Sequence, residues 1–378
     1  MRFLSTSGLF NPEIWRLRKL DLYIIRKFLG TFFLAIALLI LIVIIFDVSE
    51  KVDDFLEKQA PLSKILFSYY LSFIPYFVNL FSPLFTFIAV VYFTSKLATR
   101  SEIVAILSSG ISFNRLLRPY LISAFVLAIL TFYLANFLIP ITNRTLLEFE
   151  YTYIKNKPKS SNRHIHMQIR PGQFIYIESF NKELNTGYRF TMEERDGDAM
   201  RGKMGASIIR WDSLTRIWSM DDYFIRSWDG HKERYVRGEK MDTLLPFTPA
   251  DLAVSFDDVK LMNFWQLREF IRQEEMKGNE GIIEYEVEKH RRIAFPFATV
   301  ILTLIGMALS SRKVRGGIGV HLGAGIAISF AFILFMQIST TFAIYGNLHP
   351  GLAVWVPNLL FGVLAVYLVR IAPKYVGA

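Results

Sequence analysis

The sequence predicts an α-helical membrane protein with six transmembrane helices and an all-β domain inserted between the third and the fourth. Three observations predict this fold class. Long uncharged stretches recur along the 378 residues, the chain between residues 144 and 292 changes to short β-type runs, and basic residues gather on one side of the predicted spans. Only 20% of the residues are charged, against about 25% in a typical soluble domain, and mean hydropathy is +0.33. This composition excludes a disordered chain and disfavours an ordinary soluble enzyme.

Three transmembrane helices are predicted in residues 1–143, because about 20 apolar residues cross the hydrocarbon core as a helix. They are expected at residues 24–47, 65–95 and 118–142. The residues before the first span, 11–27, have the pattern of a basic amphipathic helix at the cytoplasmic membrane surface, or of a charged lead-in to the span.

A short cytoplasmic helix is predicted at residues 99–110, between the second and third spans. Ser101 or Thr99 can cap its start, Glu102 lies in its first turn and Gly110 can end it. Its small and apolar residues are too few to cross a membrane, so the pattern is typical of a helix that docks on a cytosolic partner or of an ordinary loop.

The inserted domain is predicted at residues 144–262. Short β-type runs from about residue 164 to 243 are separated by turn signals such as Asp196-Gly197, Asp212-Ser213 and Asp229-Gly230. Strands at this spacing indicate an antiparallel sandwich or barrel of about 100 residues.

The last third, residues 263–378, is predicted to begin with an external connecting helix and to hold three further spans. These are expected at residues 290–311, 318–343 and 351–371. The stretch from 316 to 369 carries no formal charge, and a turn-forming run at residues 345–350 divides it into two helices.

Charge predicts the orientation of the chain. The flanks at 1–27, 96–118, 312–315 and 370–378 together carry 15 basic and three acidic residues, whereas the loop at 47–64 carries three basic and five acidic ones. Because Lys and Arg accumulate on the cytoplasmic side, both termini are predicted to be cytoplasmic and the β domain external. The net charge of +10 therefore reflects topology, and nucleic acid is not an expected partner.

Several classes of chemistry are absent from the sequence. The chain has no cysteine, which excludes disulfides and thiolate metal sites. It has no P-loop motif, so we expect no ATP binding of that kind. His164 and His166 share one face of a predicted strand but lack a third ligand nearby, so no metal site is predicted. No carboxylate lies within the uncharged stretches, which disfavours an ion-coupled transporter.

Four stretches resemble the lipopolysaccharide export permease family of the LptF/LptG (YjgP/YjgQ) type. They are RSEIVAILSSGIS at 100–112, EKHRRIAFP at 288–296, WVPN at 355–358 and LDLYIIR at 20–26. Their order around six spans and a β insert covers essentially the whole chain. The resemblance implies the transmembrane subunit of an ABC exporter in the bacterial inner membrane, with a periplasmic β-jellyroll-like domain.

The resemblance also implies a function and partners. The subunit would extract lipopolysaccharide from the outer leaflet of the inner membrane and pass it through its β domain to the transport bridge. Expected partners are a cytosolic ABC ATPase dimer, a paralogous permease subunit, and LptC-like and LptA-like bridge proteins. The chain itself would be no enzyme and bind no cofactor, since ATP and Mg would lie on the ATPase. An ion-gradient-driven lipid transporter and a non-transporting envelope scaffold are the alternatives.

Site residues follow from the resemblance in three groups. Coupling to the ATPase is assigned to Arg100, Glu102, Ile103, Ala105, Ile106 and Gly110, with the carboxylate engaging the partner and the apolar residues filling its groove. Contact with lipid phosphates is assigned to Lys51, although four carboxylates surround it in the sequence. The lipid cavity is predicted to be lined by Phe32, Phe33, Leu39, Ile42, Phe81 and Phe85.

Overall fold

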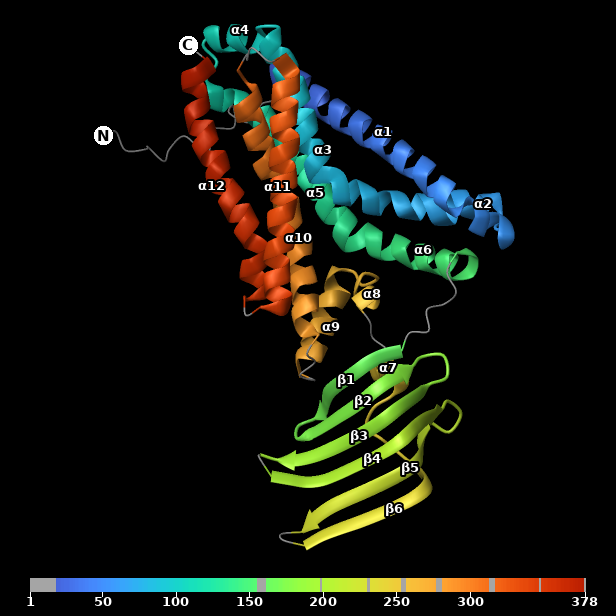
Figure 1. Cartoon of the computed structure of the whole chain (residues 1–378). Helices are drawn as coiled ribbons and strands as arrows, with labels where there is room; N and C mark the ends of the chain where they lie inside the picture. Colours follow the sequence, from blue (N-terminus) through green and yellow to red (C-terminus); the bar gives the residue numbers. More distant parts are fainter. Residues whose placement is uncertain are drawn as a thin grey trace. The chain divides into compact units, whose positions relative to one another are not determined.

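The computed structural model of the chain describes residues 18–154, 161–197, 199–229, 232–252, 256–276, 281–312, 317–346 and 348–376. Within them, six helices are long and apolar enough to cross a membrane: Lys19–Glu57, Leu62–Thr99, Phe113–Tyr153, Ile282–Ser310, Gly317–Tyr345 and Pro350–Ala372. Six antiparallel strands lie between the third and fourth of these helices (Figure 1). This confirms the six helices and the inserted β domain. Residues 11–17 of the predicted amphipathic segment at 11–27 lie outside the described residues, and residues 19–27 belong to α1.

The helices are longer than the predicted spans. Helix α1 runs Lys19–Glu57, where residues 24–47 are predicted, and α10 runs Ile282–Ser310, so it begins eight residues before the predicted residue 290. The second and third spans contain π-helical segments, η3 at Ile65–Tyr70 and η4 at Leu134–Leu138, between α-helical parts. The remaining helices of these spans are α2 (Leu62–Lys64), α3 (Leu71–Thr99), α5 (Phe113–Tyr133) and α6 (Ile139–Tyr153), followed late in the chain by α11 (Gly317–Tyr345) and α12 (Pro350–Val376).

The chain forms two compact units. The first comprises residues 1–49, 74–135 and 290–378, and the second comprises residues 50–73 and 136–289. The first unit therefore holds most of the membrane helices. The second holds the sheet, the helical segments just before and after it in sequence, and residues 50–73. Each unit is described by itself below.

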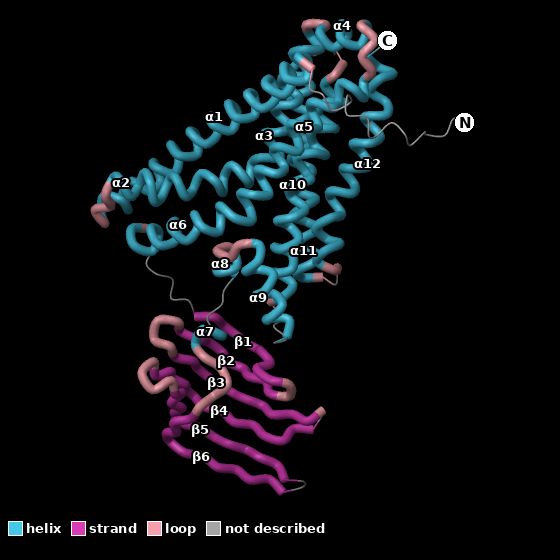
Figure 2. The backbone as a smooth tube through the Cα atoms, turned by 180° about the vertical axis from the view of Figure 1, so that it is seen from behind, coloured by secondary structure: helices cyan, strands magenta, loops and turns pink. Residues whose placement is uncertain are grey.

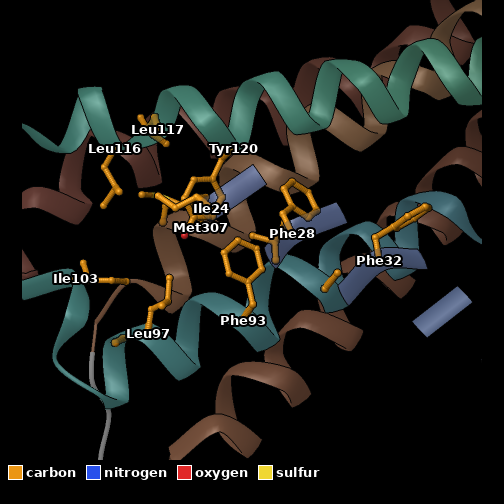
Figure 3. Packing of buried hydrophobic residues seen from close by; sticks show 14 of the residues in the cluster. Ile24, Phe28, Phe32, Phe93, Leu97, Ile103, Leu116, Leu117, Tyr120 and Met307 are labelled. Atoms are coloured by element: carbon orange, nitrogen blue, oxygen red, sulfur yellow. The ribbon is translucent and has the colours of Figure 1, made fainter. Parts of the chain in front are cut away.

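An apolar stripe on α1 forms the centre of the first unit. Ile24, Phe28, Phe32 and Ile36 recur every fourth residue, which places them on one helix face. The Phe28 ring stacks on Phe93 of α3 at 5.6 Å between centroids (Figure 3). Helices α1 and α3, with α5, are thus held by one continuous buried cluster.

Two glycines let α10 and α11 approach α3 closely. A Cβ at Gly306 would lie 3.1 Å from Val90, and one at Gly325 would lie 2.6 Å from the buried Phe87 ring. Small residues at helix contacts are typical of membrane bundles, where close backbone packing replaces the hydrophobic driving force between helices.

An aromatic cluster fixes the helical part of the second unit. Tyr69 of η3 is fully buried and lies 5.7 Å from the Phe55 ring at the end of α1 and 5.1 Å from the Phe149 ring of α6. Three segments far apart in the sequence thus meet at edge-to-face and tilted contacts, which are the favoured geometries for aromatic pairs.

The β domain is a single six-stranded sheet in the described residues. Consecutive strands pair antiparallel in the order β1-β2-β3-β4-β5-β6, which is the order of a meander (Figure 2). The strands are β1 Ser161–Arg170, β2 Gln173–Asn181, β3 Thr186–Asp196, β4 Ala199–Asp212, β5 Ile217–Asp229 and β6 Lys232–Thr243. Helices α7 (Pro249–Leu252), α8 (Phe256–Val259) and α9 (Phe264–Met276) follow, and α9 occupies the place of the predicted connecting helix.

One face of the sheet carries the domain's apolar core. Trp218 is fully buried there and its indole N–H donates to the Phe247 carbonyl oxygen at 2.9 Å, so the segment after β6 covers this face. Such a bond is what a buried indole requires.

The alternation of side chains is broken along one row of this sheet. Residues three apart on a regular strand point to opposite faces. Nevertheless, Ile177 and Phe180 of β2 both belong to the buried core, as do Ala206 and Ile209 of β4. The break falls where Arg189 of β3 and Asp222 of β5 adopt positive φ angles of 51° and 52°. A residue with left-handed backbone reverses the pleat locally, so the side chains before and after this row both point to the core face. Neither of the two left-handed residues is a glycine.

Candidate functional site

The short helix α4, Glu102–Ser108, connects α3 to α5. Gly110 ends the turn after it with φ +87°, and its N–H donates to the Leu107 carbonyl oxygen at 3.1 Å, as the sequence predicts. The predicted side-chain cap at the start is wrong. Ser101 occupies the N-cap position with φ 60° but makes no capping hydrogen bond, and the Thr99 hydroxyl donates back to the Ser95 carbonyl oxygen.

The apolar side of α4 is anchored in the first unit. Ile103 is only 1% exposed and belongs to the same buried cluster as Leu97 and Leu116 (Figure 3). Ile106 and Leu107 are partly buried against that cluster. These three positions recur at three- and four-residue spacing, so they form one face of the helix.

This anchoring corrects one expectation for the coupling residues. Ile103 holds α4 to its own chain, and its side chain is not on the surface where a partner's groove would receive it. The opposite face presents Val104, which is 50% exposed, together with the exposed Ala105 and Ser108. Arg100 and Gly110 are also exposed at the two ends. The helical spacing of residues 103, 106 and 107 was the available signal that Ile103 is buried and that Val104 replaces it on the surface.

Glu102 lies at the start of α4 and is partly exposed. The hydroxyl of Tyr23 on α1 donates to Glu102 Oε2 at 3.3 Å. This weak contact orients the carboxylate at the surface, beside the first turn of α4, where the helix dipole favours a negative charge.

A forked ion pair next to α4 joins α1 to α5. Arg115 donates from Nη1 to Asp21 Oδ1 at 2.6 Å and from Nη2 to Asp21 Oδ2 at 2.5 Å. Asp21 is only 3% exposed and also accepts from the Arg18 backbone N–H at 2.8 Å. Ser112 caps α5 by accepting from the Arg115 backbone N–H. Sequence reasoning missed this pair, because 94 residues separate its partners. Asp21 lies in the family-like stretch at 20–26, but nothing in that stretch indicates Arg115 as its partner.

The groups that could hold a metal ion are sparse. Among the residues that the structure describes, no group of three or more His, Asp or Glu side chains has a geometry suited to a metal. The ring of His166 lies 4.4 Å from that of Tyr176, and the side chain of His164 is outside the described part of the chain.

Comparison with known protein families shows which family the chain belongs to. The family model described as lipopolysaccharide export system permease LptF/LptG matches residues 22–371. The chain belongs to the LptF/LptG family. Among curated proteins, no match is found. The family match confirms the resemblance that the four sequence stretches indicate, and it identifies the chain as a permease subunit of lipopolysaccharide export that is not itself an enzyme.

In this LptF/LptG permease, Lys51 lies near the C-terminal end of α1 in the second unit. Its ammonium group donates to the Tyr69 hydroxyl and lies 5.0 Å from the centre of the Tyr69 ring. Tyr69 is part of the buried aromatic cluster, so the lysine is held in place by its own chain. The sequence predicts the lysine but not the tyrosine that positions it.

The six residues predicted to line a lipid cavity of the permease do not share one surface. Phe32 is fully buried in the central cluster, which corrects its assignment as a lining residue, and Phe85 packs against the same cluster. Phe33 and Ile42 on α1 are about half exposed, at 49% and 51%. Leu39 and Phe81 are of intermediate exposure. The exposed side of α1 is thus apolar, whereas the stripe beside it is buried in the central cluster.

Proposed function

We propose that the chain is a transmembrane subunit of an ABC exporter that extracts lipopolysaccharide from the outer leaflet of the inner membrane. Energy would come from a separate cytosolic ATPase dimer, and a paralogous permease subunit would complete the membrane part. The lipid would leave through the β domain towards LptC-like and LptA-like bridge proteins. The observation that carries this proposal is the match to the permease family over residues 22–371.

The geometry of α4 supports its role as the ATPase contact. One face is fixed in the helix bundle through Ile103, and the other presents Val104, Ala105 and the partly exposed Glu102. A helix that is anchored on one side and exposed on the other transmits a displacement to the elements that hold it. Here those elements are the ends of α1, α3 and α5, which share the central cluster.

The exposed apolar side of α1 supports a lipid path along this helix. Phe33 and Ile42 lie nine residues apart, at opposite edges of this side, and are suited to contact acyl chains or the second permease subunit. At the outer end, Tyr69 holds the Lys51 ammonium, where a cation can meet a lipid phosphate. Movement of the lipid past these residues would be driven by closure of the two permease subunits.

The sheet is proposed to lie in the periplasm and to pass the lipid to the bridge proteins. The excess of 15 basic over three acidic residues on one set of flanks supports this orientation. The long antiparallel strands β4, β5 and β6, of 14, 13 and 12 residues, offer an extended surface for the passage of a lipid.

The decisive experiment replaces Glu102 and measures recovery of the ATPase in pull-downs at matched membrane levels of the chain. If the carboxylate only favours the helix start, Glu102→Ala costs less than about 1 kcal/mol and leaves the complex intact. If it pairs with a basic residue of the ATPase, truncation typically costs about 2–5 kcal/mol, or about thirtyfold and more in affinity. We expect loss of the ATPase with Glu102→Ala and a larger loss with Glu102→Lys.

Tyr23→Phe is the matched control, because it removes the hydroxyl that contacts Glu102 and leaves the carboxylate in place. We expect this variant to recover the ATPase like the wild type. Normal recovery of the ATPase and normal transport with Glu102→Lys would refute the assignment of this carboxylate to the ATPase interface.

A further inference from the structure

An open groove of about 400 Å³ lies on the β domain. Its side chains include Tyr176, Phe224 and Tyr235 with Arg189, Asp222 and Arg237. A single row of strand pairs connects three of them: Tyr176 pairs with Thr191, Thr191 with Gly205, Gly205 with Phe224, and Phe224 with Arg237.

The groove lies on the sheet face opposite the apolar core. Ile175 and Ile177, the neighbours of Tyr176 on β2, both belong to the core, so Tyr176 points to the other face. The same holds for Thr191, which follows the buried Phe190 on β3. This groove is therefore separate from the apolar surface of the sheet that Phe247 covers.

The groove extends to the row where the pleat reverses, two residues along the strands from the row of Tyr176 and Phe224. Arg189 and Asp222, the two residues with left-handed backbone on the reversal row, both line the groove. A left-handed conformation costs an L-residue with a Cβ about 1–2 kcal/mol, and such outliers persist where the surrounding structure holds them, often at functional positions. The strained backbone at Arg189 and Asp222 thus lies in the wall of the groove.

Two aromatic rings, those of Phe224 and Tyr235, form a platform that lines the groove. A Cβ at Gly205 would lie 2.6 Å from the Phe224 ring, so the glycine lets this ring lie flat across the backbone of β4. The Tyr235 ring stacks beside it, with 6.3 Å between centroids and planes 23° apart. Two neighbouring ring faces are thus presented to the groove.

Polar groups beside the platform are already oriented by one another. Asp222 accepts from Arg237 Nη2 at 2.9 Å through Oδ1 and from the Ser207 hydroxyl at 2.9 Å through Oδ2. The hydrogen bonds from Arg237 and then Ser207 lower the pKa of Asp222, which keeps this carboxylate ionised and purely an acceptor. Arg189 pairs with Glu178 at 2.7 Å, so each guanidinium is balanced by a carboxylate.

We propose that this groove binds the saccharide part of the exported glycolipid, an inference that rests on the proposed function. Sugar rings present C–H faces that stack on aromatic faces, and hydroxyls that both donate and accept. The flat Phe224 and Tyr235 rings and the paired Arg237 and Asp222 side chains supply both kinds of contact.

Other ligand classes fit less well. An acyl chain would leave the ion pairs of the groove without hydration, and a bare phosphate prefers an excess of positive charge, which the two balanced arginines do not provide. A peptide strand adds to the edge of a sheet, whereas this groove spans β2 to β6 on its face.

The test titrates the full-length protein in detergent with the deacylated saccharide released from lipopolysaccharide, using calorimetry. We expect saturable binding that Tyr235→Ala and Arg237→Ala each weaken by about tenfold or more. The matched control is Tyr188→Ala, since Tyr188 is a similarly exposed tyrosine of β3 outside the groove. This variant should bind within about twofold of the wild type.

A second variant tests the platform without removing a contact. Gly205→Ala should force the Phe224 ring away from β4 and weaken saccharide binding. Protection of the β-strand amides from hydrogen exchange verifies that the domain is folded. The proposal is overturned if the saccharide shows no saturable binding, or if all three groove variants bind like the wild type. Normal lipid export without saccharide binding would refute the saccharide site and leave the proposed function intact. Saccharide binding by a chain that associates with no ATPase would refute the proposed function and leave the saccharide site intact.

Discussion

Arg189 is the most strained side-chain-bearing residue on the strands that form the groove. Its φ angle of 51° lies in the region that glycine and, to a lesser extent, asparagine and aspartate tolerate. Asp222 on β5 belongs to that tolerant group, whereas an arginine does not. The ion pair with Glu178 is largely exposed, with 77% of the Arg189 side chain accessible, so it offsets little of this strain.

The first prediction compares two substitutions at this residue. Arg189→Gly and Arg189→Ala both remove the ion pair, but only glycine relieves the left-handed strain. We expect Arg189→Gly to be more stable than Arg189→Ala by about 1 kcal/mol. Hydrogen exchange of β3 amides in the full chain measures the difference, and equal protection in the two variants would show that Arg189 bears no strain.

At the scale of single residues, the sequence predicted the structure correctly where the residue type alone determines the local backbone conformation. Gly110 ends α4 as its residue type predicts, because a left-handed residue after a helix favours glycine. The burial of Ile103 in its own helix bundle was not predicted. Hydrophobicity alone does not distinguish a residue that packs in its own chain from one that contacts a partner. The Tyr69 contact of Lys51 was missed for another reason, because it joins two segments whose approach depends on the fold.

At the scale of elements, α4 is held by more than its own apolar face. The forked pair between Asp21 and Arg115 connects the start of α1 to the start of α5, which directly follows α4. Asp21 is almost fully buried, so the loss of Arg115 would leave a desolvated carboxylate without its charged partner.

The second prediction is a double-mutant cycle on this pair. Arg115→Ala alone is expected to destabilise the first unit by about 3 kcal/mol, because it leaves the buried carboxylate uncompensated. Adding Asp21→Ala should recover part of this loss, with a coupling energy of about 2 kcal/mol. Unfolding in mixed micelles measures all four proteins, and strictly additive effects would contradict a direct interaction.

Prediction of the elements from sequence succeeded for the long apolar helices and failed in details that depend on tertiary contacts. Five uncharged stretches, the last of them divided by a turn, predict six helices, because each span has to satisfy its own backbone in lipid. Short β-type runs and turn signals likewise predict the strands. The pleat reversal at Arg189 and Asp222 was not foreseen, because the expected marker of a positive φ angle is glycine and neither residue is one.

At the scale of the whole molecule, orientation follows from charge and not from any single contact. The basic flanks of the spans are separated in sequence and share only their predicted side of the membrane. The orientation of the chain therefore depends on the sum of many Lys and Arg residues, each of which weakly favours the cytoplasmic side.

The third prediction tests this orientation with protease sites in intact cells. Tags at residues 1 and 378, and a site inserted at the exposed Ser109 after α4, should be protected. A site inserted at the exposed turn near Asp196 should be cut once the outer membrane is opened. Protection of the Asp196 site together with cleavage at Ser109 would show that the topology is the reverse of the predicted one.

The central claim, that this permease exports lipopolysaccharide with the energy of a separate ATPase, is tested most directly by transfer from proteoliposomes to a soluble acceptor. The chain is purified in mild detergent, with and without the proteins that co-elute with it, and reconstituted with lipopolysaccharide. We predict ATP-dependent transfer from the assembled complex, and neither ATP hydrolysis nor transfer from the chain alone. Hydrolysis and transfer by a preparation that contains only this chain would contradict the account.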